Sequence, residues 1–264
     1  GFLVVDKEPG MTSHDVVAIA RKALGTRKVG HAGTLDPMAT GVLVLGFGNG
    51  TRLLQYITDG DKSYTATIVL GASTVTDDHE GEILIATDAH AVDEAEIKKI
   101  LSAMVGTISQ RPSSVSAVKV DGERAYDRVR AGEVFELASR TVTISTLAIL
   151  EIRHLETTTE VDIDVTCSAG TFIRAIARDL GDELKVGGHL RALRRGSREP
   201  PVQHPAALLA RRREGPGALA LRGFQHVVIA ARVLAVPPAA FQPFGARHDA
   251  RPRIAQGDRL RQQP

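Results

Sequence analysis

Residues 30–41 read GHAGTLDPMATG and run directly into the apolar segment VLVLGFG at residues 42–48. Because Pro37 disfavours the helical conformation in the residue before it, Asp36 is expected to be extended. The glycines of the segment allow backbone turns that other residues resist. The pattern therefore predicts a loop that fixes one carboxylate at the mouth of a buried strand, with small neighbours that leave room for a substrate. The alternative is an Asx turn, in which Asp36 only binds its own backbone.

Strand and helix patterns alternate over the rest of residues 1–197. Helical periodicity predicts helices over residues 12–25, 92–106 and 170–184. The first is expected to be capped by Thr12 or Ser13 and closed by Gly25, with an inner face of Val16, Val17, Ala20 and Leu24. Alternating or β-branched apolar runs predict strands over residues 42–48, 64–71, 142–152 and 159–167. Because strands outnumber helices and no regular βαβ spacing occurs, the predicted fold class is α+β, with a mixed sheet rather than a doubly wound one.

The charge distribution divides the chain near Ser197. Residues 1–197 carry 22 Lys plus Arg against 27 Asp plus Glu, a net charge of −5, whereas residues 198–264 carry 11 Arg against four Asp plus Glu, a net charge of +7. The second segment also contains nine of the 12 prolines and no Lys. Three interpretations stay open: a basic tail that contacts nucleic acid, a disordered extension, and a solvated appendage.

Several classes of protein are excluded by motifs that the sequence lacks. The single cysteine, Cys167, excludes an internal disulfide and a cysteine-clustered zinc site, and no HExxH segment occurs, so no structural metal is expected. The apolar runs are shorter than the roughly 20 residues of a membrane helix and the first residues lack signal-peptide features, so we expect a cytoplasmic protein without a membrane anchor. No phosphate-binding GxxxxGK[ST] loop, dinucleotide-binding glycine pattern or GxSxG elbow is present. A carboxylate that works without cofactor or metal remains, and Asp36 is the first candidate.

Arg174 lies in the first turn of the helix predicted over residues 170–184, where the helix dipole disfavours a cation by roughly 0.3–1 kcal/mol. A nearby anion would offset this cost. On a helical wheel Arg174 flanks the apolar stripe, so its head can reach inward, whereas Arg178 points further toward water. An ion pair between Arg174 and Asp36 would aim the carboxylate and favour its charged form. The alternative is an ordinary surface arginine.

Motifs along the chain resemble, in order and spacing, those of the tRNA pseudouridine synthase B (TruB) family: DKEPGMTSHDVV, GHAGTLDPMATGVL, DKSYTATIVLG, CSAGTFIRAIARDLG and LRALRRGS. The resemblance covers about residues 2–197, and its HxGxLDPxAxG loop is highly specific. It implies a mixed, largely antiparallel central sheet of the pseudouridine synthase type with flanking helices, in a catalytic domain over residues 1–197. It also implies an isomerase that converts the uridine at position 55, in the T loop of tRNA, to pseudouridine, as a cytoplasmic monomer that binds the T arm. The reaction is redox-neutral, so no cofactor, metal or ATP is required.

The resemblance gives Asp36 the place of the essential aspartate, with three proposed actions: attack at C1′ of the ribose, addition to C6 of the uracil, or removal of a proton at C2′. Arg174 corresponds to the arginine that pairs with this aspartate. Tyr64 corresponds to the tyrosine that packs against the target base, because a base removed from its stack needs an aromatic or apolar face. Without the resemblance, a lone tyrosine in a predicted strand would be assigned to the core.

Further residues are implied to bind the substrate. His31 corresponds to the histidine that acts on the RNA where the uridine leaves, Leu193 to a pocket leucine, and Lys7 to a lysine near the floor of the active site. Arg194 and Arg195 are expected to meet phosphate groups. Without the resemblance, His31 would be interpreted as an exposed loop residue, Lys7 as a surface lysine, and the two arginines as a solvated basic run.

Two features depart from the family pattern. Phe172 stands where many relatives have tyrosine, so stacking on the substrate can persist but a hydroxyl group is lost. After Ser197, the Arg-, Pro- and Ala-rich residues 198–264 occupy the place of the family's end of the catalytic domain and of its small C-terminal RNA-binding (PUA-like) domain. The pattern of neither part is recognisable there.

Three other functions compete with this prediction. The first is a related pseudouridine synthase that acts on another RNA. The second is a non-catalytic tRNA-binding or RNA-folding protein, although binding alone would not need an acidic group facing phosphate-rich RNA. The third is a glycosidase with paired carboxylates, but nothing near Asp36 in the sequence supplies the acid partner that this reaction requires.

Overall fold

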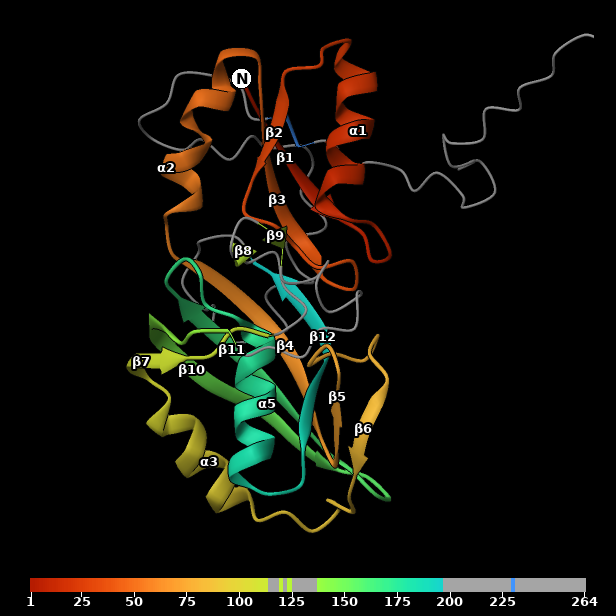
Figure 1. Cartoon of the computed structure of the whole chain (residues 1–264), viewed down its shortest axis with the longest axis vertical. Helices are drawn as coiled ribbons and strands as arrows, with labels where there is room; N and C mark the ends of the chain where they lie inside the picture. Colours follow the sequence, from red (N-terminus) through yellow and green to blue (C-terminus); the bar gives the residue numbers. More distant parts are fainter. Residues whose placement is uncertain (114–118, 121–122, 125–136, 197–228, 231–264) are drawn as a thin grey trace, which may run out of the picture. The chain divides into compact units, whose positions relative to one another are not determined.

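The computed structural model describes residues 1–113, 119–120, 123–124, 137–196 and 229–230. All of them belong to one compact unit, Gly1–Val233 (Figure 1). The domain boundary predicted at Ser197 and nearly all of residues 198–264 lie outside the described residues, so the two-domain division stays a prediction. Every helix among the described residues is too short or too polar to cross a bilayer.

The main sheet has nine strands, in the order β13–β1–β3–β12–β4–β11–β10–β7, with β2 paired to β3 beside this path (Figure 1). Its strands are β1 (Phe2–Lys7), β2 (Val29–Ala32), β3 (Thr40–Phe47), β4 (Lys62–Leu70), β7 (Gly106–Gln110), β10 (Arg140–His154), β11 (Thr159–Cys167), β12 (Gly188–Arg195) and β13 (Ile229–Ala230). Two small sheets consist of β5 (Ala72–Thr74) with β6 (Ile83–Ala86) and of β8 (Lys119–Val120) with β9 (Glu123–Arg124). Among the described strands of the main sheet, only β1 with β13 and β3 with β12 are parallel pairs, so the predicted mixed, largely antiparallel sheet is confirmed.

The helices are α1 (Ser13–Leu24), α2 (Leu54–Thr58), α3 (Glu94–Ala103) and α5 (Ile173–Glu183), with a 3-10 helix, η1 (Gly48–Leu53). Helix α1 begins as predicted, because the Thr12 side chain accepts from the Asp15 N–H and the Asp15 carboxylate accepts from the Thr12 N–H. It ends at Gly25, whose φ of 60° is left-handed. The predicted inner face of α1 is confirmed except at Leu24, which is 41% exposed.

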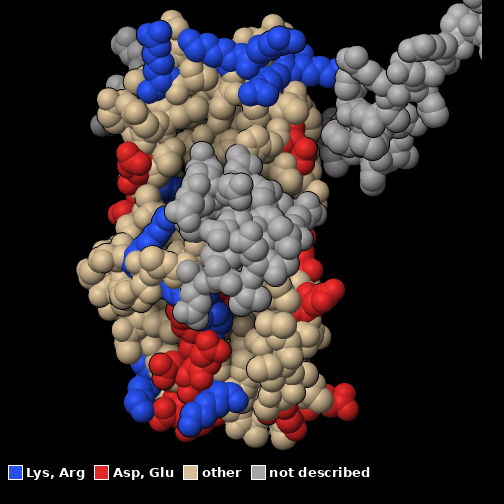
Figure 2. All heavy atoms as spheres, viewed as in Figure 1, with Lys and Arg blue, Asp and Glu red and all other residues tan. Residues whose placement is uncertain are grey.

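The core lies between the sheet and its helices. Helix α5 packs on β4 and β12, and α3 packs on α5 and β10 (Figure 1). The largest fully buried apolar side chains come from both layers: Leu43, Leu45, Ile68, Leu70, Ile97, Leu101, Ile144, Ile163, Ile176, Leu180 and Leu190. Helix α1 packs against β2, and Lys and Arg side chains gather beyond this region, at the top of the space-filling view (Figure 2).

Strand β3 changes partners along its length. Its outer part, up to Phe47, pairs with β2, whereas Thr40 and Gly41 pair with the last two residues of β12. One row of Cα partners therefore crosses the sheet through Lys7, Gly41, Arg195 and Tyr64, on β1, β3, β12 and β4. Residues paired in this way point to the same face of a sheet. The row brings together three residues that the sequence analysis selected from segments far apart in the chain.

Strand β12 reaches this row through a bulge. Its register against β4 shifts between Leu190 and Ala192, and Ala192 is exposed like the bulged residue before it. The shift turns Leu193 and Arg195 inward, where both are buried, and leaves Arg194 exposed. The interpretation of the two arginines as a solvated basic run is therefore wrong for Arg195.

Gly41 is the position of this row that a side chain would disturb most. Its φ is 99°, and a Cβ atom there would meet the backbone of Arg195, with the Arg195 N atom at 2.8 Å. We expect Gly41→Ala to lower the free energy of unfolding by about 3 kcal/mol, from backbone strain and overpacking together. Gly10→Ala is the matched control, because φ there is 78° but no atom lies within 4 Å of the added Cβ. Urea unfolding should show that Gly10→Ala lowers the free energy of unfolding by only about 1 kcal/mol. Equal losses in the two variants would contradict the close approach of β12 to Gly41.

Candidate active site

The loop between β2 and β3 presents Asp36. It leaves β2 through Gly33, whose φ is 85°. The Ala39 N–H donates to the Asp36 carbonyl over 3.1 Å, and the Gly10 N–H donates to the Pro37 carbonyl over 2.9 Å, so both ends of the turn are fixed. The Asp36 side chain keeps 34% exposure. The loop thus holds a carboxylate at the mouth of β3 where a ligand can reach it.

Arg174, at the start of α5, bridges two carboxylates. Its Nε atom lies 3.1 Å from Asp36 Oδ2, and its Nη2 donates to Asp36 Oδ1 over 3.3 Å. Its Nη1 lies 3.1 Å from Asp78 Oδ2 and donates to the Thr76 carbonyl over 2.8 Å. The predicted ion pair is present, and Asp36 accepts from the guanidinium rather than from its own backbone as an Asx turn would require. Arg174 is 7% exposed and Asp78 5%, so Asp36 is the accessible member of the group.

Asp78 is a residue of the site that the sequence patterns did not predict. Its Oδ1 accepts from Thr76 Oγ1 over 2.6 Å and from the Glu80 N–H over 3.1 Å, while Oδ2 faces Arg174. The loop that carries it is anchored on β12, because the Leu190 N–H donates to the Asp77 carbonyl over 3.0 Å. The available signal was the pair of aspartates in TVTDDHEG at residues 74–81, which resembles an ordinary turn.

The prediction for Arg178, which lies one turn after Arg174, is wrong. Arg178 was expected to point toward water, but its side chain is only 11% exposed. Its Nη1 lies 3.1 Å from Asp77 Oδ2, and its Nη2 lies 2.7 Å from Asp179 Oδ1. The two arginines of α5 therefore bind the two adjacent aspartates of the loop after β5, which fixes the helix relative to that loop.

Tyr64 and Arg195 lie side by side in the row that crosses the sheet. Tyr64 is 8% exposed, and burial raises the pKa of its hydroxyl while the Arg195 charge opposes that shift. Arg195 is 5% exposed, and its Nε and Nη2 donate to the carbonyls of Val42 and Gly33 over 2.6 Å and 3.1 Å. The contact with phosphate that was expected for Arg195 stays a prediction, and Nε and Nη2 already donate to backbone carbonyls. Arg195 thereby joins the end of β12 to both sides of the Asp36 loop.

Arg194 and Leu193 point to opposite sides of β12. Arg194 is 53% exposed and forms a two-point ion pair with Asp6, with N–O distances of 2.9 and 3.0 Å. Leu193 is 7% exposed and belongs to the core. Arg194 is therefore accessible to a phosphate but must share its charge with Asp6.

His31 lies in β2, opposite Leu45, and not in an exposed loop. Its ring meets the ring of His14 edge to face, with centroids 5.4 Å apart. Burial lowers the pKa of His31 and the neighbouring His14 and Arg195 lower it further, while an interaction with the Gly33 backbone opposes the shift. Its Nδ1 atom is buried and has no hydrogen-bond partner among the described residues. The environment thus favours a neutral ring.

Phe172 caps the N-terminus of α5 with an extended backbone. The buried Gln110 amide holds it at two points, because Nε2 donates to the Phe172 carbonyl over 3.0 Å and Oε1 accepts from the Phe172 N–H over 2.8 Å. Gln110 ends β7 and was not selected from the sequence. This clamp fixes where α5, and with it Arg174, begins.

Lys7 is 1% exposed, so the interpretation as a surface lysine is wrong. Its Nζ donates to the carbonyls of Met11, Glu8 and Pro37 over 2.6, 3.0 and 3.1 Å. The last of these bonds ties the ammonium to the residue that follows Asp36. Lys7 therefore supports the loop through its backbone, and its place at the floor of the active site stays a prediction.

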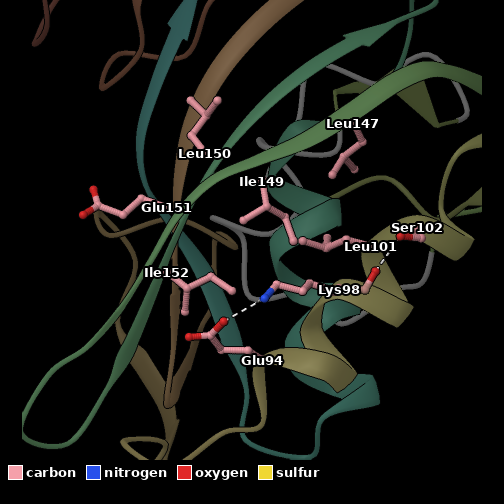
Figure 3. Close-up of a pocket in the computed structure, with 9 residues that line it drawn as sticks. All are labelled: Glu94, Lys98, Leu101, Ser102, Leu147, Ile149, Leu150, Glu151 and Ile152. Atoms are coloured by element: carbon pink, nitrogen blue, oxygen red, sulfur yellow. Dashed lines mark hydrogen bonds and ion pairs between the residues drawn. The ribbon is translucent and has the colours of Figure 1, made fainter. Parts of the chain in front are cut away.

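Two further features bear on alternative sites. In the part of the chain that the structure describes, no three His, Cys, Asp or Glu side chains are grouped so that they could hold a metal ion. A hollow of about 400 Å³ lies between α3 and β10, where Lys98 Nζ is 2.8 Å from Glu94 Oε2 (Figure 3). It is lined by Glu94, Lys98, Leu101, Ser102, Leu147, Ile149, Leu150, Glu151 and Ile152. None of these was predicted to act on RNA, and this hollow is separate from the Asp36 site.

Comparison with known proteins gives matches over most of the described chain. Residues 21–173 match the family model described as TruB family pseudouridylate synthase (N terminal domain). The tRNA pseudouridine synthase B of Corynebacterium efficiens is 53% identical over 210 residues, which cover 80% of this chain and 71% of that protein. The Arthrobacter sp. protein of the same name is 59% identical over 197 residues, which cover 74% of this chain and 64% of that protein.

Solved structures of other proteins also match this chain. A chain of a Cbf5-Nop10-Gar1 complex is 33% identical, with a TM-score of 0.56, over 74% of this chain and 47% of that chain. A chain of an H/ACA RNP bound to a substrate RNA containing 2′-deoxyuridine is 30% identical, with a TM-score of 0.53, over 74% of this chain and 46% of that chain. The predicted resemblance and the predicted type of sheet are both confirmed. The chain spans about two thirds of the length of the curated relatives and less than half of these structures.

Lys7 leads to a prediction about the pH dependence of stability. Burial lowers the pKa of the Lys7 ammonium from 10.5 to about 8, and the Asp36 charge is the largest influence that opposes this. Between these two values the unfolded chain binds the Lys7 proton more tightly than the native protein does. Through this group the free energy of unfolding therefore rises with pH in that window, by up to about 1.4 kcal/mol per pH unit.

We expect Lys7→Met to remove this contribution, measured by urea unfolding at about pH 8, 9 and 10. The difference between wild type and variant is the relevant quantity, because burial raises the pKa of Cys167 to about 11 and gives both proteins a slope of opposite sign. Lys22→Met, at an exposed lysine, should keep the wild-type slope. Identical slopes in wild type and Lys7→Met would contradict the buried ammonium.

Proposed function

Because the chain belongs to the TruB family of pseudouridylate synthases, we propose that it converts a uridine of tRNA, the one at position 55 in the T loop, to pseudouridine. The observation that carries the proposal is the partly exposed Asp36 carboxylate, which two nitrogen atoms of the buried Arg174 hold at 3.1 and 3.3 Å. A bond between two atoms in each partner fixes the direction of a carboxylate as well as its position.

The proposed reaction is an isomerisation. The bond between N1 of the uracil and C1′ of the ribose breaks, the base turns, and a bond forms between C5 and C1′. The proton leaves C5 and a proton is bound at N1, so no electron, metal or co-substrate enters the balance. The site needs one group that acts on the sugar or base and a surface that holds the base while it is detached.

Asp36 is the group proposed to act. Three actions remain for its carboxylate: attack at C1′, addition to C6, and removal of a proton at C2′. Arg174 and Asp78 serve all three, since the buried pair keeps the guanidinium in place and the guanidinium aims the accessible carboxylate. Arg174 and Asp78 are positioning residues in this account.

The surface for the base is proposed to consist of residues around Asp36. Tyr64, buried in the row beside Arg195, offers an aromatic face, and Leu193 and Phe172 offer apolar ones. A base that leaves its stack regains part of the lost energy on such faces. His31 is proposed to act on the RNA where the uridine leaves. Its neutral, aromatic character suits contact with bases better than contact with phosphate.

The remaining parts of the proposal concern the whole protein. We propose that residues 1–197 carry out catalysis and that the protein binds tRNA through the T arm. We also propose that it is a cytoplasmic monomer. Residues 198–264 stand in the place of the family's RNA-binding domain and are proposed to add electrostatic attraction to tRNA because of their net charge of +7.

A non-catalytic RNA-binding protein is the competing class. Against it, such a protein gains nothing from an arginine that fixes an accessible carboxylate among phosphates.

The test is to incubate the purified chain with unmodified tRNA and to map pseudouridine along it. We expect modification at position 55 by the wild type. Asp36→Asn keeps the shape and removes the charge, so it should abolish product while tRNA affinity stays within a few fold. Asp59→Asn, at an exposed aspartate between α2 and β4, is the control and should keep full activity. Appreciable turnover by Asp36→Asn would overturn the assignment.

A further inference from the structure

Cations are segregated in the first part of the chain. Residues 1–197 are acidic overall, yet between Asp15 and Asp36 the sequence has no Asp or Glu. The same interval carries Arg21, Lys22, Arg27 and Lys28, named here the α1 cluster. Within the acidic residues 1–197 this interval is therefore a local excess of positive charge, and Asp36 is the next carboxylate after it.

The structure gathers the α1 cluster at one end of α1 and β2. All four residues are exposed, and in the described part of the chain none of them forms an ion pair with a carboxylate. Lys and Arg side chains run across this end of the molecule, at the top of Figure 2, whereas basic and acidic side chains are mixed at the opposite end. A depression of about 560 Å³ lies within the cluster, lined by Arg21, Lys22, Gly25, Thr26 and Arg27.

The turn that carries the cluster is held in place. Arg21 Nη2 donates to the Val29 carbonyl over 3.1 Å, and the Lys28 carbonyl accepts from the Gly48 N–H over 2.9 Å. The C-terminal dipole of α1 accounts for cations in its last turn, at Arg21 and Lys22. It does not account for the two that follow the helix, so the cluster exceeds what the stability of α1 requires.

The cluster lies within reach of an RNA bound at Asp36. Strand β2 begins directly after Lys28 and leads to His31 and then to the Asp36 loop. At about 3.3 Å per residue, three residues of strand separate Lys28 from His31 by roughly 10 Å. That distance corresponds to a few base pairs of a stem.

We propose that the α1 cluster binds the phosphate backbone of the substrate's stem, next to the loop that carries the target uridine. The inference rests on the proposed function for the identity of the RNA. A regular stem presents phosphates at short intervals, which suits unpaired cations around a shallow depression. The lysines of α3 show the contrast, because Lys98 and Lys99 are paired with Glu94 and Glu96 at 2.8 and 3.1 Å.

The test compares two double variants of equal charge change. Arg27→Gln with Lys28→Gln removes half of the α1 cluster, and Lys98→Gln with Lys99→Gln removes two exposed, adjacent lysines elsewhere. Affinity for an unmodified tRNA and for its isolated T-arm stem–loop is measured as a function of salt, with the single-turnover rate at saturating RNA and the melting temperature of each protein.

For the cluster variant we expect binding of both RNAs to weaken about tenfold at roughly 0.1 M salt, and the slope of log Kd against log salt to become shallower by about 1.5–2. Its saturating rate and melting temperature should match wild type, and the α3 variant should bind normally. A wild type that binds RNA through the cluster but forms no pseudouridine would refute the proposed function and support this inference. Unchanged affinity and slope in the cluster variant, or equal losses in both variants, would overturn it.

Discussion

The ion pairs of one guanidinium constrain the whole site. Arg174 is buried at the start of α5, and it meets a buried carboxylate, Asp78, on one side and an accessible one, Asp36, on the other. A buried cation without partners costs several kcal/mol, so the loops that carry both aspartates must stay in contact with α5 for the fold to be stable. Stability and the orientation of Asp36 therefore depend on the same contacts. The second arginine of the helix, Arg178, strengthens this link through Asp77.

The sheet supplies the second constraint. Strand β3 pairs with β2 along its outer part and with β12 at Thr40 and Gly41, and the Asp36 loop lies at this exchange. A side chain at Gly41 would prevent the approach of β12. With β12 in place, Arg195 binds the carbonyls of Gly33 and Val42 on either side of the loop, and Lys7 binds the carbonyl of Pro37 within it. The loop is thus supported by buried cations that donate to its backbone, which leaves its one carboxylate free to face a substrate.

Local features were predictable from the sequence. The cap at Thr12, the end of α1 at Gly25 and the alternating strand at residues 159–167 depend on neighbouring residues, and the pairing of Arg174 followed from an unfavourable cation at a helix N-terminus. What the sequence analysis missed depends on contacts between distant segments. Asp78 resembles a turn residue until α5 is packed beside it, Arg178 becomes buried only through that loop, and Arg195 turns inward because of a bulge in β12. A helical wheel or a count of charges contains no information about such partners.

We propose above all that Asp78 acts on the reaction through Arg174. The most direct measurement is the single-turnover rate of pseudouridine formation for Asp78→Asn beside Asp77→Asn, with the melting temperature and tRNA affinity of each. Both substitutions remove one buried carboxylate from the same loop, but only Asp78 contacts the arginine that holds Asp36. A misplacement of about 1 Å at a reacting group can cost roughly a hundredfold in rate. The account predicts a loss of tenfold to a hundredfold for Asp78→Asn, with affinity nearly unchanged, and a loss of no more than a few fold for Asp77→Asn. Equal rates in the two folded variants would contradict it.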